Sequence, residues 1–339
     1  MDGSMRAGRF LRGISSIVLA ACVAVALAGN AAGAEGRKEH PTSCAGLAPG
    51  PTHTVARIID GETLALDDGS EVRLIGVLAP RASDADAEAG RWPPEIAAIA
   101  ELEGLVLAKS VELAFGGERA DRYGRALAHV TWRDTERRHW LQGHMLEQGL
   151  ARAYVQAGNR ACAAELMEAE RIARQARRGL WAEAAYAVRP AGGPLALSRR
   201  RSSFQVVEGH IERVGQGRGA IYLDFGVGRG AFSVSLRRAD RALLGDSADN
   251  PKALEGKVVL VRGWIERRSG AFNGPVIDLS AGGLIEVLET AAEGRPSAPN
   301  VWARHRRSAG AWRYSGSQRP ELGQDRHIRS RGRDSEDRP

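Results

Sequence analysis

Short strand-like segments separated by turn residues restrict the possible folds of this chain more than any other feature. They cover residues 55–59, 63–66, 72–77, 111–115 and 127–132. The second and third flank residues 67–70 (D-D-G-S), a turn signal typical of a β-hairpin. Apolar residues at helical spacing occupy 94–108, 138–148 and 160–178, and the last two segments end at glycines. This order predicts an α+β domain that is mainly β.

A second group of strand patterns follows a stretch rich in glycine, proline and arginine. Residues 183–204 hold two prolines and two glycines before three consecutive arginines, which is typical of a linker. Strand patterns then cover 204–214, 220–225, 231–236, 257–266, 275–279 and 284–288, with a short helix expected over 238–244. Short strands with a single helix suit a small β-barrel over residues 205–290.

The two ends of the chain differ from its body. Three arginines precede an apolar run over 14–28, and small residues lead to Ala34, as in a secretory signal peptide over 1–34. Two alternatives remain, an uncleaved membrane anchor and a lipid anchor at Cys22. Residues 35–52 are a polar lead-in, and residues 291–339 are expected to form a disordered basic tail. The protein is therefore expected to be exported, to the periplasm or beyond the cell.

The net charge of +7 lies entirely in these two ends. The tail holds 11 arginines and 6 acids, and the first 34 residues hold three arginines and one aspartate. The body between them is neutral, so bulk charge gives its barrels no attraction for a polyanion. The tail is the part whose charge would attract nucleic acid or an anionic surface.

Export would leave two cysteines, Cys44 and Cys162, in an oxidising compartment. This favours one disulfide between them. Such a bond closes a loop of more than 100 residues and would stabilise the fold by roughly 4 kcal/mol in the chain-entropy description. The alternative is a buried free thiol at Cys162.

Acidic and arginine side chains around the first hairpin form a pattern suited to phosphate. Asp60 and Glu62 flank a glycine after the first strand, Arg73 lies on the third, and Arg125 follows a Tyr-Gly turn. A planar guanidinium binds two phosphate oxygens at once and stays charged. Nearby carboxylates could hold a hard cation that polarises a phosphoryl group.

These residues belong to a series of motifs through which residues 53–182 resemble the staphylococcal nuclease (thermonuclease) family. The motifs are I-D-G-E-T at 59–63, R-L-I-G-V at 73–77, D-R-Y-G-R at 121–125, Q-G-L-A at 148–151 and R-G-L-W at 178–181. The resemblance implies a five-stranded barrel of the oligonucleotide-binding (OB) type with three helices. It also implies cleavage of DNA and RNA phosphodiester bonds with one calcium ion. Residues 205–290 resemble a second OB-type barrel, on weaker motifs.

The resemblance assigns roles position by position. Arg73 and Arg125 match the two arginines that bind the scissile phosphate and stabilise the transition state in the family. Glu62 stands where the family has a calcium-ligating aspartate, and Asp60 matches an outer-shell acid of that site. The structural alternative is that both arginines pair with nearby acids, Asp60, Glu62 or Asp121.

Three further residues are predicted to bind substrate. Tyr123 and Tyr154 match family positions near the nucleotide pocket, and Arg122 precedes Tyr123 in the same motif. An aromatic ring at such a position could stack on a base. The alternative for a tyrosine is burial in the core.

The loop after the third strand departs from the family pattern. Where the family has D-T-P-E, this chain has Leu78-Ala79-Pro80-Arg81. Leu78 replaces the second calcium carboxylate, and Arg81 replaces the glutamate proposed as general base. Calcium prefers six to eight oxygen ligands, many from carboxylates, and an arginine does not accept a proton at neutral pH. The loop therefore predicts weak calcium binding, although Asp84, Asp86 or Glu88 could supply a replacement ligand.

Two functions of different classes follow. One is a metal-dependent nuclease with weak or lost activity. The other is a non-catalytic module of the cell envelope that binds nucleic acid or another protein. DNA, RNA and an envelope protein are thus the predicted partners, and the sequence does not indicate an oligomeric state.

Overall fold

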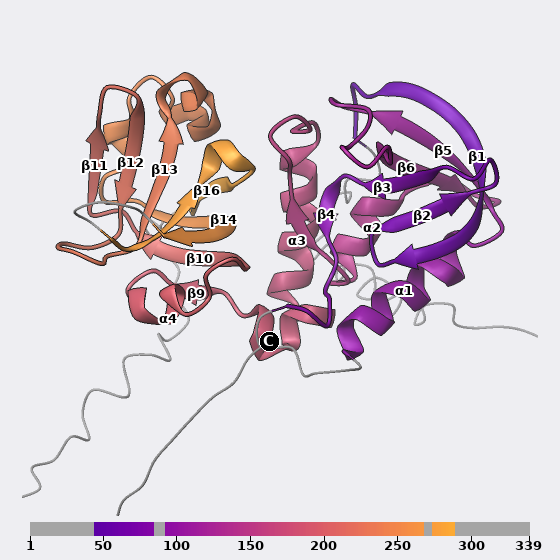
Figure 1. Ribbon diagram of the computed structural model, residues 1–339, viewed down its shortest axis with the longest axis horizontal. Coiled ribbons are helices and arrows are strands. Elements are labelled where there is room, and N and C mark those ends of the chain that lie inside the picture. The colour runs from indigo at the N-terminus through magenta and orange to yellow at the C-terminus, as the bar shows by residue number, and fades with distance from the viewer. Residues whose placement is uncertain (1–43, 85–91, 268–272, 289–339) are drawn as a thin grey trace, which may run out of the picture. The chain divides into compact units, whose positions relative to one another are not determined.

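The computed structural model describes residues 44–84, 92–267 and 273–288 (Figure 1). The predicted signal peptide, the first part of the lead-in, Asp86, Glu88 and the basic tail lie outside the described residues. Within the described part, no helix has both the length and the apolar character needed to cross a membrane. The described residues all belong to one compact unit.

Five strands form the first barrel (Figure 1). They are β1 (Ala48–Asp60), β2 (Thr63–Leu66), β3 (Glu71–Leu74), β5 (Ser110–Phe115) and β6 (Ala126–Arg133). The sheet runs β3-β2-β1-β5-β6, and a parallel pairing of β3 with β6 closes it into a mixed barrel. The predicted α+β fold with an OB-type barrel is confirmed. Strand β1 begins inside the stretch expected as lead-in and pairs there with β5.

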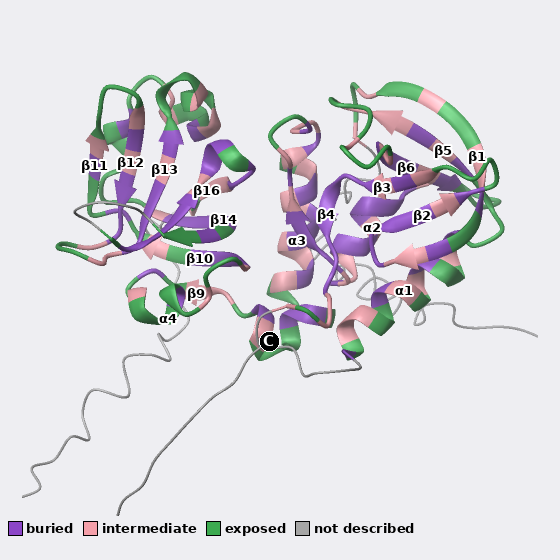
Figure 2. Ribbon diagram, in the orientation of Figure 1, coloured by how far each residue is buried: buried purple, intermediate pink, exposed green. Residues whose placement is uncertain are grey.

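The β2–β3 hairpin forms where the Asp-Gly signal predicts it. Leu66 N–H donates to Ser70 O at 2.8 Å, and Gly69 has φ +83°, a conformation that glycine adopts at no steric cost. Alternate residues of the hairpin then point into the barrel. Figure 2 shows the buried positions along these strands, which include Leu64, Val72 and Leu74.

Three α-helices accompany this barrel: α1 (Pro93–Val106), α2 (Leu141–Glu147) and α3 (Ala163–Gln175). Two of them begin later than their patterns predict. The residues before α2 form strand β7 (Arg138–Trp140), which pairs with β6. Those before α3 end at Cys162, whose φ of +63° lies outside the helical region. Pairing with β6 overrides the helical spacing before α2, and Cys162, which is held by a disulfide, precedes α3.

The predicted disulfide joins Cys44 to Cys162, with their Cα atoms 5.6 Å apart. Cys162 is buried within the core of the first barrel, and Cys44 packs against that core. The bond therefore fastens the start of the described chain to the beginning of α3. The alternative of a free thiol at Cys162 is wrong.

A second barrel has the same strand connections as the first. Its strands are β10 (Phe204–His210), β11 (Arg213–Gln216), β12 (Ala220–Asp224), β13 (Ser233–Arg237), β14 (Val258–Arg267) and β15 (Pro275–Asp278), with β16 (Leu284–Leu288) paired to β14. The order is β11-β12-β13-β15-β14-β10, with β13 and β15 parallel. Because β11 follows β10 after two residues, the chain itself closes the barrel. The predicted second OB-like barrel is confirmed, and the segment Arg238–Ser247, where a helix was expected over 238–244, forms 3₁₀ turns interrupted by a kink.

The stretch predicted as a linker is structured. It contains a 3₁₀ turn (Ala184–Tyr186), strand β9 (Arg189–Pro190) and helix α4 (Pro194–Ser198). Strand β9 adds to the edge of the second barrel beside β10. Tyr186 and Leu197 are both buried, so apolar contacts fix this segment despite its prolines and glycines.

A buried ion pair joins α3 to the second barrel. Glu170 and Arg262 are both almost fully buried, and Arg262 Nη1 donates to Glu170 Oε1. The other carboxylate oxygen accepts the Ala153 N–H at 2.6 Å, and Arg174 adds a third donor at 3.1 Å. This network anchors the second barrel to α3 and to strand β8 (Arg152–Tyr154), which contains Ala153.

Buried His129 on β6 makes the stability of this fold depend on pH. Its Nδ1 accepts a hydrogen bond from Trp140 Nε1 at 3.3 Å, and burial lowers its pKa from 6.5 to about 4. A group with a depressed folded pKa contributes full stability above the unfolded pKa. We therefore expect the free energy of unfolding to fall by about 3 kcal/mol between pH 6.5 and pH 4 through this group.

Urea unfolding across that pH range measures the loss. His129→Gln is the matched control, because glutamine still offers Trp140 an acceptor and has no proton to gain. The pH dependence of the variant should be flatter than that of the native protein. If the free energy of unfolding depends on pH equally in both proteins, His129 does not control that dependence.

Candidate functional site

The turn between β1 and β2 carries Glu62 into a buried position. Gly61 precedes it, and a Cβ on that glycine would lie 2.7 Å from Ala79 Cβ, so only glycine lets the two loops approach. Asp60 Oδ1 accepts the Glu62 N–H at 2.9 Å and fixes the turn. Glu62 is fully buried as a result, beside the loop in which this chain departs from the family.

Both carboxylate oxygens of Glu62 are occupied by donors of the protein. Oε1 pairs with Arg73 Nη2 at 2.9 Å and also with Arg81 Nη2. Oε2 accepts the Ala79 N–H at 3.0 Å. Asp60 Oδ2 lies 3.8 Å from Arg81, which places a second carboxylate beside the same guanidinium. Arg81 thus supplies the positive charge that balances these acids.

The residues present do not fit the calcium ion that the sequence resemblance implies. Both carboxylate oxygens of Glu62 already accept from donors of the protein. The guanidinium of Arg81 lies against Oε1, where it opposes a cation. Leu78 is buried and brings no oxygen from its side chain. Calcium takes several carboxylate or carbonyl oxygens, so this set would hold it only after Arg81 moved away.

Of the three replacement ligands predicted from the sequence, Asp84 lies within the described residues, and it too is engaged. Asp84 Oδ2 accepts from Tyr186 Oη at 2.7 Å and from Arg152 Nη2 at 3.2 Å. The Arg81 N–H donates to the same oxygen at 3.2 Å. Burial, and then the hydrogen bond to Asp84, raises the pKa of Tyr186, while burial lowers that of Arg152. Asp84 is therefore a structural acid of the loop.

Arg125 and its neighbours form a second group. Arg125 Nε and Nη2 donate to Asp121 Oδ2 at 2.8 and 2.7 Å. Partial burial opposes ionisation of Asp121, but hydrogen bonds from Arg125 and from the Tyr123 N–H hold its pKa below the usual value. The ion-pair alternative predicted for Arg73 and Arg125 describes what both arginines do in this structure.

Tyr123 is the most open residue of this group. Its side chain is 69% exposed, and the guanidinium groups of Arg122 and Arg125 lie 4.8 and 5.5 Å from its ring centre. A guanidinium over an aromatic face is a favourable arrangement. The D-R-Y-G-R turn thus presents an aromatic ring with two cations to solvent.

The strand register places Arg73 and Arg125 on one face of the barrel. Arg73 on β3 pairs with Leu127 on β6, and residues two apart on a strand share a face. Arg125 lies two residues before Leu127 and therefore projects to the same side. The register thus aligns the predicted phosphate-binding pair on one side of the barrel, although each arginine holds an acid.

Tyr154 lies elsewhere, against the second barrel. Its ring makes edge contacts with Phe204 and Trp264, with centroids 5.4 and 6.4 Å away. Strand β8, which carries it, pairs with β4 (Gly76–Leu78) rather than with β3 or β6. Its role in substrate binding stays a prediction, and its surroundings are those of an aromatic cluster shared by both barrels.

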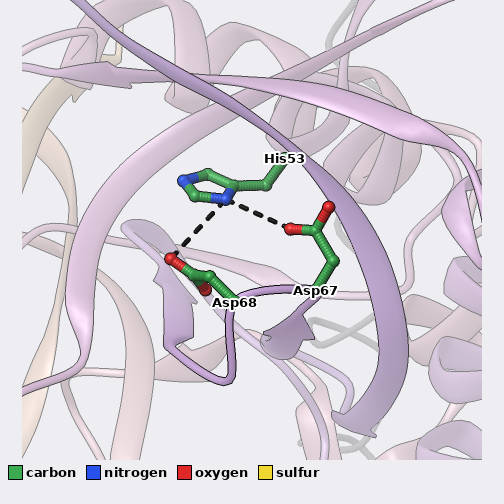
Figure 3. A group of neighbouring side chains, drawn as sticks. All are labelled: His53, Asp67 and Asp68. Carbon is green, nitrogen blue, oxygen red and sulfur yellow. Dashed lines mark hydrogen bonds and ion pairs between the residues drawn. The ribbon is translucent and has the colours of Figure 1, made fainter.

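A separate group with metal-ligand spacing occurs on the surface. His53 on β1 points toward Asp67 and Asp68 of the β2–β3 turn (Figure 3), and one ligand atom from each lies within 4.8 Å of the others. These residues pair with one another, His53 Nδ1 lying 3.3 Å from Asp67 and 3.7 Å from Asp68. The turn lies at the opposite end of β2 from Glu62, so this group is not part of the predicted calcium site.

The comparisons agree with the sequence motifs. The family model described as staphylococcal nuclease homologue matches residues 71–183. The match contains Arg73, Arg81, Tyr123 and Arg125, and it begins after the turn that carries Glu62. No curated protein matches the chain.

Proposed function

Since residues 71–183 form a staphylococcal nuclease homologue domain, we propose that this protein binds the phosphodiester backbone of DNA or RNA without calcium-dependent hydrolysis. The family typically depends on calcium, and its substrates are nucleic acids. The observation that supports loss of hydrolysis is the saturated carboxylate of Glu62, which Arg73, Arg81 and the Ala79 N–H occupy together.

Binding would use the face that carries Arg73 and Arg125. An incoming phosphate would compete with Asp121 for Arg125, whose side chain is 23% exposed. Arg122 and the open ring of Tyr123 lie beside it and suit a phosphate and a base of the same strand. Arg73 is 13% exposed and more firmly held by Glu62, so Arg125 should contribute more to affinity.

The proposal includes export and an envelope setting. The N-terminal pattern supports secretion, and the disulfide between Cys44 and Cys162 suits an oxidising compartment. The basic tail would add a nonspecific attraction for nucleic acid or an anionic surface. A lipid anchor at Cys22 and a membrane anchor remain the alternatives for its attachment.

Fluorescence anisotropy with labelled single-stranded DNA and RNA tests the proposal, alongside a gel assay of cleavage. We expect salt-dependent binding that an excess of chelator does not change, and no cleavage with calcium. Arg125→Ala should weaken binding by about tenfold, because a charge-assisted hydrogen bond to phosphate is lost.

Two controls separate the alternatives. Arg133→Ala removes an exposed arginine at the far end of β6 and should leave affinity nearly unchanged, since Arg133 pairs with Glu112. A chain ending at Thr290 measures the share contributed by the tail. Calcium-dependent cleavage that disappears in Arg125→Ala would sink the proposal in favour of a working nuclease.

A further inference from the structure

A cavity of about 320 Å³ opens between the candidate site and the second barrel. Its lining includes Arg81 and Asp84 from the loop after β4, Arg152 from β8, and Arg201 and Trp264 from the second half of the chain. Arg81 is also the residue that pairs with Glu62. The cavity therefore adjoins the nuclease-like site, and none of the sequence motifs accounts for it.

The charge of this cavity favours an anion. Three arginines line it against one aspartate. Arg152 is neutralised by Asp84, and Arg81 by Glu62. Arg201 is exposed, and no carboxylate of the part of the chain that the structure describes pairs with it. Arg201 is thus the cation available to a ligand, and Ser202 beside it offers a hydroxyl donor.

An aromatic surface accompanies this cation. Trp264 lines the cavity and keeps 39% of its surface exposed, an unusual state for so large an apolar side chain. Edge contacts with Phe204 and Tyr154, with centroids 5.9 and 6.4 Å away, hold the indole in place. A fixed, partly open aromatic ring beside an arginine is the combination with which proteins hold single-stranded nucleic acid.

The positive lining continues beyond the first cavity. A second one, of about 190 Å³, is lined by Arg201, Arg267 and Glu266 among others. Arg201 belongs to both, so it lies between them. A ligand that follows these arginines would be an extended polyanion that runs from Arg81 past Arg201 toward Arg267.

We propose that the cavity at Arg201 and Trp264 holds one nucleotide unit of a single-stranded nucleic acid, with its phosphate at Arg201 and its base against Trp264. The inference rests on the proposed function, since the strand is the one bound at Arg125. The cavity volume is at the lower end of the range that encloses a small organic ligand, which suits one nucleotide unit. An acidic peptide would satisfy Arg201 but would leave the indole without a base.

Fluorescence anisotropy of the full chain with a labelled thymidine oligonucleotide, in chelator, tests the inference. Trp264→Ala should weaken binding at least about fivefold through lost stacking. Arg201→Glu should weaken it about tenfold, since an anion now faces the phosphate. Arg218→Glu makes the same charge change on an exposed loop of the second barrel and should have a much smaller effect. Circular dichroism of each variant checks that it folds.

The pattern of losses distinguishes this inference from the proposed function. If Arg201→Glu and Trp264→Ala weaken binding but Arg125→Ala does not, the cavity is the site and the role proposed for Arg125 is wrong. Weakening by Arg125→Ala alone, or by Arg201→Glu and Arg218→Glu equally, would overturn the cavity site. A native chain that binds no oligonucleotide, or that binds an oligoglutamate peptide equally well, would overturn it too.

Discussion

Arg262→Ala should lower the free energy of unfolding by about 3 to 5 kcal/mol, because it breaks a buried ion pair and removes a large buried side chain. Glu170 is fully buried. Arg262 lies on β14 of the second barrel, donates to Glu170 and is 1% exposed. Without that guanidinium, the carboxylate would keep Arg174 and the Ala153 N–H, and a space would replace a large side chain. The variant tests whether one contact fastens the two barrels.

Urea unfolding followed by tryptophan fluorescence measures the effect. Arg213→Ala is the matched control from the same barrel, because its side chain is 64% exposed and pairs with Asp224. It should cost less than about 1 kcal/mol. The double variant Glu170→Gln/Arg262→Met removes both charges and should lose less than Arg262→Ala alone. A loss below about 1 kcal/mol for Arg262→Ala would show that the pair does not hold the barrels together.

Leu78→Asp/Arg81→Glu should restore metal-dependent cleavage, with a rate roughly 10²- to 10⁴-fold above that of the native chain, the usual contribution of a positioned general base. The change removes the guanidinium from Glu62 Oε1 and adds two carboxylates at the positions where the family has them. The freed set would offer the oxygens that a divalent cation requires. Gel assays with calcium, manganese and chelator measure the gain.

Single variants separate the two causes. Arg81→Gln frees Glu62 without supplying a carboxylate, so it should restore little or no cleavage. Arg81→Glu keeps Leu78, whose burial near Trp92 and Leu180 makes it the riskier position for folding. Cleavage by Arg81→Gln equal to that of the double variant would mean that the guanidinium alone blocks the site. No gain in any variant that still folds would refute the idea that this loop controls hydrolysis.

The sequence anticipated much of the fold because its signals are local. The Asp-Gly turn, the alternating strand residues and Gly149 after α2 each act over a few neighbouring residues, and the structure confirms their elements; α3 instead ends at Gln175, before the predicted Gly179. Where prediction failed, packing against a neighbouring element decided the outcome. Residues 138–140 joined β6 as a strand although they lie within a helical pattern. The stretch before residue 204, rich in glycine and proline, became packed structure because Tyr186 and Leu197 are buried.

The candidate site was predicted from sequence motifs and the family resemblance that they carry, and was corrected by geometry. Arg73, Arg125, Glu62 and Asp60 were identified as a group, and the register and contacts bring the first two to one face and the acids to one turn. That Arg81 would pair with Glu62, and that Asp84 would be held by Arg152, was not visible in the motif. Nothing in the sequence pointed to Glu170 with Arg262, because the partners are 92 residues apart.

By itself the sequence determined the order of strands and helices, the disulfide pair and the residue types at the phosphate-binding positions, since these depend on local spacing and on residue chemistry. Only the tertiary structure decided which of those charges remain available. Ion pairs depend on which segments meet: Arg81 satisfies Glu62, Asp84 satisfies Arg152, and Arg201 has no acidic partner in the described chain. The packing of these segments also leaves Trp264 partly exposed, in the cavity that Arg201 lines.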